Sequence, residues 1–256
     1  VDTHHIAVHV PDLGNLTYDS KLELAHDLGA VRNRFQAEEL IEKANARGIY
    51  VIARLVVFKD RRLYSYQDHA YALWDKTRDA PWGHLRTTTN EETGEETTEQ
   101  VEHWVDGYSP FVWDYNIAVA RELQDLGVDE LQFDYIRFPS DGDLTRIGHR
   151  HRQAGMRPVD ALESFLKKAR SSLHIPLGTD VYGFNAWARM DYLGQNIGMI
   201  SRYVDVISPM FYPSHFSRSF LPSFAYVDRA TEIYRAGTRR ASEIVGGRAL
   251  IRPFVQ

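Results

Sequence analysis

The stretch ELQFDYIRFPSDG, Glu130 to Gly142, decides how the fold of this chain is interpreted. Most of it is apolar, as expected of a buried strand, but Asp134 stands in its middle, beside Tyr135 and just ahead of Arg137. A carboxylate inside a buried strand is costly unless the protein requires it there. The stretch therefore predicts a core strand whose end belongs to a functional site.

Similar apolar runs recur along the chain and alternate with amphipathic segments of helical period. The predicted strands are Ile6–Val10, Gly48–Phe58, Val128–Phe138, Ile175–Gly183, Val204–Tyr212 and Ala249–Val255. The predicted helices run over about Arg34–Ala46, Phe111–Leu126, Pro158–Leu173, Gly194–Tyr203 and Tyr226–Gly237. This alternation indicates an α/β fold with a parallel sheet, and most of the strands are apolar on both faces, which is typical of such sheets.

The simplest architecture is one TIM-type (β/α)8 barrel domain over residues 1–256. The predicted strands are two fewer than such a barrel has, so we expect the first and last strands to be missing or poorly recognised. A long excursion, about residues 61–107, exceeds what a connection between strand and helix needs. Its centre, Thr87–Gln100, is rich in Thr and Glu and predicts either a solvated hairpin or a lid with aromatic margins.

Composition excludes several classes of protein. The chain is 43% hydrophobic and 25% charged, which is typical of a globular protein. Its net charge of -5 gives no basic field for a phosphate backbone, so we expect no nucleic-acid partner. The absence of cysteine excludes disulfides and thiolate metal sites. No apolar run reaches the roughly 20 residues of a membrane span, and no signal peptide opens the chain.

Polar residues gather where the predicted strands end, which is where parallel barrels place their chemistry. In chain order they are His9 and Asp12; Arg54, Lys59 and Asp60; Asp134, Tyr135 and Arg137; Thr179, Asp180 and Tyr182; Tyr212, Ser214 and His215; and Arg252 with Gln256. One polar strand end would mean little. Polar residues at all of them predict a common site.

Asp134 and Asp180 each close an apolar strand beside an aromatic residue. Glycoside hydrolysis requires two such carboxyl groups, one as nucleophile or base and the other as acid. We expect Asp134 to be the nucleophile or base, kept ionised by Arg137, and Asp180 to be the general acid, although the two roles are interchangeable on sequence alone. A structural salt bridge from Asp134 to Arg137 or Arg54 is the alternative.

Other acids are alternatives to Asp180 as the partner of Asp134, namely Asp60, Asp141 and Asp12. The remaining residues at the strand ends are expected to bind and orient a sugar or to tune the acids. They are Arg54, Lys59, Tyr135, Arg137, Tyr182, Tyr212, His215 and Arg252. Aromatic rings there would stack on sugar rings. We expect no cofactor and no metal.

Five stretches resemble a known family. They are GIYVIARLVVFKD (48–60), WVDGYSPFVWDYNIAVARE (104–122), GVDELQFDYIRFPSDG (127–142), TDVYGF (179–184) and VDVISPMFYPSHF (204–216). In this order they resemble the glycoside hydrolase domain family catalogued as DUF4015, bacterial relatives of the TIM-barrel glycosidases. The resemblance runs from about Leu16 to Gln256, and FDYIRFP with ISPMFYPSHF is its most specific part.

The resemblance implies a (β/α)8 barrel acting on a polysaccharide or a cell-envelope glycan, with Asp134 on the fourth strand and Asp180 on the fifth. It also implies an extracytoplasmic or secreted location, and it leaves the oligomeric state open. The family pattern places an acid near His9 and a lysine near Pro11, where this chain has HVPDLG. No role is therefore carried over to this first loop, although Asp12 remains.

Two other functions fit parts of the sequence. A carbohydrate-binding barrel without catalysis would use the same aromatic residues. A metal-dependent hydrolase would need clustered histidines, but His5 and His9 lie four positions apart in one predicted strand, about 13 Å from each other. His149 and His151 form an HxH motif among arginines, which we interpret as a solvated basic loop.

Overall fold

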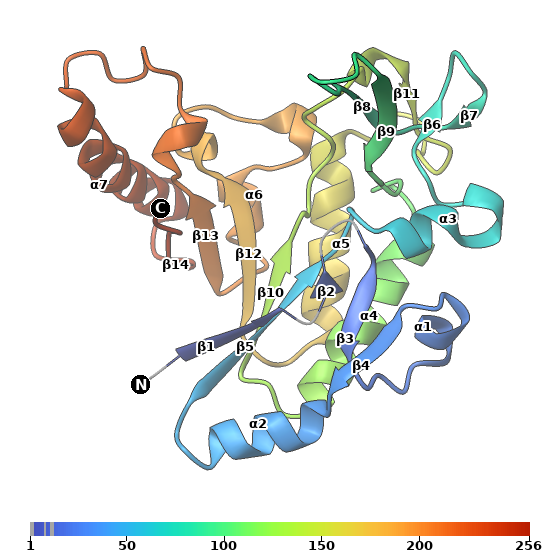
Figure 1. The fold of residues 1–256 in the computed structure, drawn as a ribbon. Coiled ribbons are helices and arrows are strands. Elements are labelled where there is room, and N and C mark those ends of the chain that lie inside the picture. The colour runs from blue at the N-terminus through green and yellow to red at the C-terminus, as the bar shows by residue number, and fades with distance from the viewer. Residues whose placement is uncertain (1–2, 8, 11–12) are drawn as a thin grey trace.

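The computed structural model of the chain describes residues 3–7, 9–10 and 13–256. Six strands form one parallel sheet in the order β1-β5-β10-β12-β13-β14 (Figure 1). Their bounds are Thr3–Ala7 (β1), Tyr50–Val56 (β5), Glu130–Asp134 (β10), Leu177–Tyr182 (β12), Val206–Met210 (β13) and Leu250–Ile251 (β14). Each overlaps a predicted strand, so the α/β class with a parallel sheet is confirmed.

The sheet is open within the described part of the chain. β1 and β14 are its outer strands, and neither pairs with a further strand at the outside. The closed barrel of eight strands is therefore not seen.

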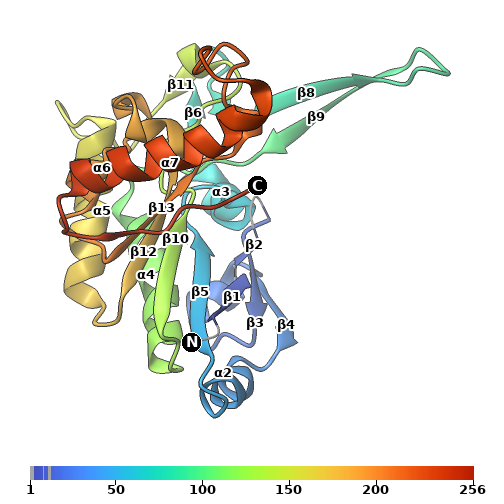
Figure 2. The ribbon, with the colours of Figure 1, turned by 90° about the vertical axis from the view of Figure 1, so that its left-hand side faces the viewer.

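Helices follow the strands as predicted. They are α2 (Ala37–Asn45), α4 (Pro110–Asp125), α5 (Pro158–Ser172), α6 (Ile197–Ile200) and α7 (Tyr226–Val245). Figure 2 shows α4 and α5 on one face of the sheet, where Phe133 of β10 packs edge-on against Phe165 of α5 with ring centres 5.3 Å apart. α7 is longer than predicted and ends at Gly246, which takes the left-handed conformation of a helix C-cap.

β10 has one apolar and one polar face, although all five of its residues are buried. Because successive side chains of a strand point to opposite sides, Phe133 meets the helices while Gln132 and Asp134 face the other way. These two contact Asp180 and Arg54, respectively. β10 is thus an exception to the prediction that most strands are apolar on both faces, since its second face carries the polar groups of the site.

The predicted first strand was placed too far along the chain. β1 ends at Ala7, and His9 belongs to β2 of a separate three-stranded sheet. His5 and His9 therefore do not share a strand, and Asp12 lies outside the described residues. The strands of this second sheet are β2 (His9–Val10), β3 (Asn15–Tyr18) and β4 (Val31–Phe35), and α1 (Glu23–Asp27) lies between β3 and β4 in sequence.

The long excursion contains a hairpin, which agrees with one of the two predictions for it. The excursion forms α3 (Arg61–His69), β6 (Trp74–Asp75), β7 (Ala80–Pro81) and the hairpin strands β8 (His84–Thr89) and β9 (Glu96–Glu102), and β6 and β7 form a small sheet with β11 (Ile147–Gly148). Figure 2 shows the hairpin projecting from the body of the molecule. Residues 85–99 are all exposed, so only its base touches the rest of the fold.

Short 3-10 helices complete the connections near the strand ends. They are Leu144–Arg146, Gly183–Ala186, Asp191–Leu193 and Pro213–His215. None of the helices that the structure describes has both the length and the apolar character needed to cross a membrane.

Candidate active site

A cavity of about 400 Å³ lies where β10, β12 and β13 end. Among its lining residues are seven of the predicted site residues: Arg54, Asp134, Tyr135, Arg137, Tyr182, Tyr212 and His215. The C-terminal edge of the sheet therefore brings together side chains that are up to 161 positions apart in the sequence, from Arg54 to His215.

Asp134, the last residue of β10, is held by two donors. Arg54 of the neighbouring strand β5 donates a hydrogen bond from Nη2 to Oδ2 of Asp134. The backbone N–H of Tyr135 donates to Oδ1 at 2.7 Å. Both contacts stabilise the negative charge of the carboxylate. The sequence assigned this task to Arg137 and named Arg54 only in the alternative of a structural salt bridge; the structure shows the contact with Arg54.

Asp180 lies beside Asp134 on the adjacent strand. Phe133 and Thr179 are partners in the register of β10 and β12, so the residues that follow them are level with each other on strands about 5 Å apart. Arg54 Nε lies 3.7 Å from Oδ2 of Asp180, so one guanidinium contacts both carboxyl groups. The structure thus places the two predicted acids side by side.

Asp180 is nevertheless almost inaccessible. It is 2% exposed, does not line the cavity, and accepts a hydrogen bond at Oδ1 from Gln132 Nε2. Burial, and next the negative charge of Asp134, raise the pKa of Asp180 well above that of an ordinary carboxyl group, against the opposing effects of Gln132 and Arg54. Asp180 therefore keeps its proton to higher pH than an exposed aspartate.

Tyr135 has an unusual backbone conformation directly after Asp134. Its φ of 52° lies in the left-handed region, which costs a residue with a side chain about 1–2 kcal/mol. The unusual φ thus occurs at the residue whose backbone N–H donates to the Asp134 carboxylate. Such strain is concentrated at functional sites, where it holds groups in working positions.

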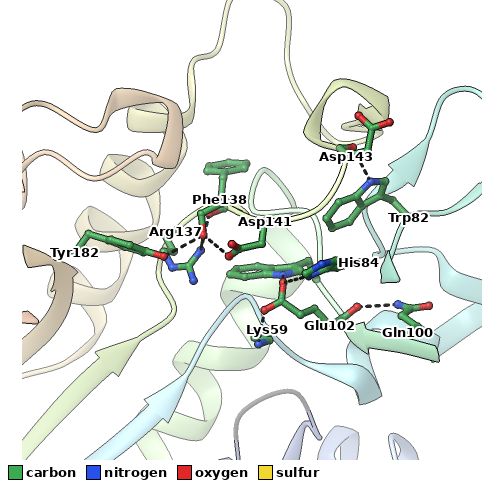
Figure 3. A network of polar contacts seen from close by, with 12 residues as sticks. Lys59, Trp82, His84, Gln100, Glu102, Arg137, Phe138, Asp141, Asp143 and Tyr182 are labelled. Carbon is green, nitrogen blue, oxygen red and sulfur yellow. Dashed lines mark hydrogen bonds and ion pairs between the residues drawn. The ribbon is translucent and has the colours of Figure 1, made fainter. Parts of the chain in front are cut away.

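Arg137 stacks among aromatic rings at the edge of the cavity. Its guanidinium carbon lies 4.8 Å from the ring centre of Trp104 and 4.9 Å from that of Tyr182. Arg137 Nη1 donates hydrogen bonds to the Phe138 carbonyl at 3.1 Å and to Ser140 Oγ at 3.3 Å (Figure 3).

Glu102 also lines the cavity, and the sequence analysis missed it. It ends β9 at the base of the hairpin and accepts hydrogen bonds from Lys59 Nζ at 2.7 Å and Trp104 Nε1 at 2.9 Å (Figure 3). Lys59 does not line the cavity, but it positions Glu102. Glu102 follows a Thr/Glu-rich stretch that was predicted to be either a solvated hairpin or a lid, and its closeness to the aromatic margin at Trp104 was the only sequence signal.

The far wall of the cavity is aromatic. The Tyr182 hydroxyl lies 3.0 Å from Ser140 Oγ, and the rings of Tyr212 and His215 meet edge to face with centres 5.2 Å apart. Burial raises the pKa of Tyr212, and the charges of Asp180 and Asp134 raise it further. Tyr212 therefore remains a hydroxyl donor at neutral pH.

Arg252 is not brought to the cavity. Its two terminal nitrogens donate to the carboxylate of Glu130, which is 2% exposed at the start of β10. Gly178 of β12 leaves room for this ion pair, because a Cβ there would lie 2.8 Å from Glu130 Oε1. The contacts of Arg252 are those of a structural ion pair.

The other acids weighed for the site have different positions. Asp60 caps α3 by accepting from the backbone N–H groups of Arg62 and Leu63. Asp141 lines the cavity, is exposed, and accepts from Ser140 Oγ at 2.7 Å. Because a substrate in the cavity could reach it, Asp141 stays an alternative to Asp180 as the second catalytic carboxyl group.

The HxH motif is tied to the fold. His149 Nδ1 lies 3.2 Å from Oδ1 of Asp106, and the backbone N–H of His151 donates to Oδ2 of the same buried carboxylate at 3.0 Å. The interpretation as a solvated loop is therefore wrong, because Asp106 anchors both residues. Among the described residues, no three His, Asp or Glu side chains gather as metal ligands.

Solved structures share this fold. A hypothetical protein from Ruminiclostridium thermocellum has a TM-score of 0.56 and 25% identity, over 71% of this chain and 84% of that chain. The trehalulose synthase MutB from Pseudomonas mesoacidophila has a TM-score of 0.52 and 12% identity, over 98% of this chain and 49% of that chain.

The C-terminal domain of a protein described as a putative chitinase from Desulfitobacterium hafniense gives a TM-score of 0.50 and 13% identity, over 100% of this chain and 57% of that chain. The chain thus spans about half the length of the last two proteins, and at these identities they show the fold alone. No curated protein matches the chain significantly. The model of the family DUF4015, described as "Putative glycosyl hydrolase domain", matches residues 2–256. The chain belongs to this family.

Proposed function

We propose that the protein hydrolyses glycosidic bonds of an oligo- or polysaccharide with a pair of carboxyl groups. The observation that carries the proposal is the placement of Asp134 and Asp180 level with each other on adjacent strands, both in contact with Arg54. Membership of a family of glycosyl hydrolase domains supports it. We also propose that the fold is a closed TIM-type barrel and that the six-stranded sheet forms most of its wall.

Asp134 is the proposed nucleophile or base. It lines the cavity, and its two donors, Arg54 and the Tyr135 N–H, fix its orientation. A fixed carboxylate either attacks the anomeric carbon or removes a proton from the attacking water. In both cases it stabilises the positive charge that the sugar ring develops in the transition state.

Asp180 is the proposed general acid, because burial and the charge of Asp134 make it the carboxyl group that retains a proton. Glu102, the other carboxyl group considered, is already engaged by hydrogen bonds from Lys59 Nζ and Trp104 Nε1. Asp180 lies behind Arg54 and Asp134, so proton delivery requires the Arg54 guanidinium to shift when substrate enters.

Sugar binding is proposed for the aromatic wall. Tyr182 and Tyr212 offer ring faces for stacking and hydroxyls for hydrogen bonds, and His215 offers a ring nitrogen. The proposed location is extracytoplasmic, as the family resemblance implies, where a glycan substrate would be met.

A panel of polysaccharides, assayed for new reducing ends with and without a chelator, tests the proposal. We expect at least one glycan to be cleaved, equally with and without chelator. Binding of glycans without release of reducing ends would favour the carbohydrate-binding alternative. Cleavage that the chelator abolishes would favour a metal-dependent hydrolase.

A further inference from the structure

Arg137 has hydrogen-bond donors to spare. A guanidinium carries five N–H groups, but only Nη1 has partners among the described residues, the Phe138 carbonyl and Ser140 Oγ. Nε and Nη2 have none, and neither is sealed off from solvent in the structure. The side chain lines the cavity although the residue is only 8% exposed.

The charge of Arg137 is also unpaired. Arg54 contacts Asp134 and Asp180, and Lys59 contacts Glu102. No carboxylate of the described residues lies within 4.0 Å of the Arg137 guanidinium. Ser140 Oγ stands between Arg137 and Asp141, since it accepts from the first and donates to the second. A largely buried cation without a counter-charge is costly, which indicates that its partner comes from outside.

Aromatic rings fix the orientation of this cation. The guanidinium carbon lies 4.8 Å, 5.4 Å and 4.9 Å from the ring centres of Trp104, Tyr135 and Tyr182. Rings at these distances stabilise the charge and restrict the side chain. An oriented guanidinium loses little entropy when it forms two parallel hydrogen bonds to an anion.

We propose that Arg137 binds an anionic substituent of the substrate, a carboxylate or a sulfate on a sugar ring, through Nε and Nη2. The substrate class is then an acidic oligo- or polysaccharide. This inference rests on the proposed function, because it places the acidic sugar in the same cavity as Asp134.

A binding experiment tests the inference without hydrolysis. Glucuronate, glucose 6-sulfate and glucose are titrated into the protein while the Arg137 Nε–Hε signal is followed by NMR. We expect at least one acidic sugar to bind about 10- to 100-fold more tightly than glucose, as hydrogen bonds to charged groups do. The acidic sugar that binds identifies the substituent. Absence of any Arg137-dependent binding, or equal affinities for all three sugars, overturns the inference.

Variants separate charge from shape. Arg137→Met is expected to abolish the preference for the acidic sugar, while Arg137→Lys keeps part of it. Arg235→Met, which removes an exposed arginine on α7, is the matched control and should keep the preference. An equal loss of affinity for glucose and for the acidic sugar in Arg137→Met would mean a structural role and overturn the inference.

An activity experiment separates this inference from the proposed function. A uronate-containing polysaccharide is compared with the same polymer after its carboxyl groups are reduced to alcohols. Preferential cleavage of the acidic polymer, lost in Arg137→Met, supports both proposals. Acidic binding without cleavage supports this inference alone. Cleavage of neutral polymers that Arg137→Met leaves unchanged supports the proposed function and overturns this inference.

Discussion

Asp134 and Asp180 lie level with each other on adjacent parallel strands, and the guanidinium of Arg54 contacts both carboxyl groups. Their surroundings differ: Asp134 lines the cavity, whereas Asp180 is buried behind it. Two identical side chains are thereby made chemically different by access and by charge. The predictions below follow from this arrangement and from the ion pairs around it.

The raised pKa of Asp180 predicts a pH-dependent stability. The folded state holds this proton at pH values where the unfolded state has already released it. The free energy of unfolding should therefore fall as the pH rises from the usual aspartate range toward the folded pKa. Asp180→Asn should remove this decline, so its stability relative to wild type should be greater at neutral than at acidic pH. Urea titrations of both proteins at several pH values would measure the difference. A parallel pH profile in the two proteins would contradict the assignment.

Asp180→Asn should also affect the leaving-group step. If Asp180 is the acid, the variant should lose about 10²- to 10⁴-fold on a natural glycan but much less on an aryl glycoside whose leaving group needs no proton. Glu102→Gln, at the cavity wall, is the matched comparison. The opposite result, a leaving-group effect confined to Glu102→Gln, would move the acid role to Glu102.

Replacing Arg54 should destabilise the fold. Arg54→Met leaves two carboxyl groups in the sheet without their shared cation, and we expect a loss of roughly 3–5 kcal/mol in unfolding free energy. Arg54→Lys should recover part of it. Chemical denaturation measures the loss, and a loss below 1 kcal/mol for Arg54→Met would show that the contacts are not as described.

Arg252 should behave as a structural residue. Arg252→Met leaves the buried Glu130 carboxylate without its cation, so we expect destabilisation toward the lower end of roughly 3–5 kcal/mol, because Arg252 is partly exposed. The KM of the protein that stays folded should change little. A large rise in KM without loss of stability would instead restore Arg252 as a sugar-binding residue.

The periodicity of the sequence was sufficient to place the sheet and its main helices. Apolar runs such as that around Phe133 and the helical period of residues 158–172 depend on local spacing, which a single sequence contains. The error at Ala7, where β1 ends before His9, arose because an apolar run gives no signal when the chain changes sheet. Strand closure depends on long-range pairing, which local patterns do not encode.

The site was predicted only in part, because the local sequence pattern marks some of its residues and not their distant partners. Asp134 and Asp180 stand out because a carboxylate interrupts an apolar strand. Their partners stand out less: Arg137 was expected to keep Asp134 ionised because it is close in sequence. Arg54 was named only in the alternative of a structural salt bridge, and strand pairing brings it there from 80 positions away. Glu102 reaches the cavity through the base of the hairpin, and the sequence did not decide whether this segment is a solvated hairpin or a lid.

The rate of reducing-end release by Asp134→Asn tests the central claim most directly. Wild type, Asp134→Asn and Asp114→Asn, which alters an exposed aspartate on α4, are compared on the best glycan substrate after all three are shown to be folded. We predict that Asp134→Asn loses at least about 10³-fold in kcat while still binding the glycan, and that Asp114→Asn keeps wild-type activity. Hydrolysis by Asp134→Asn at the wild-type rate would contradict the account.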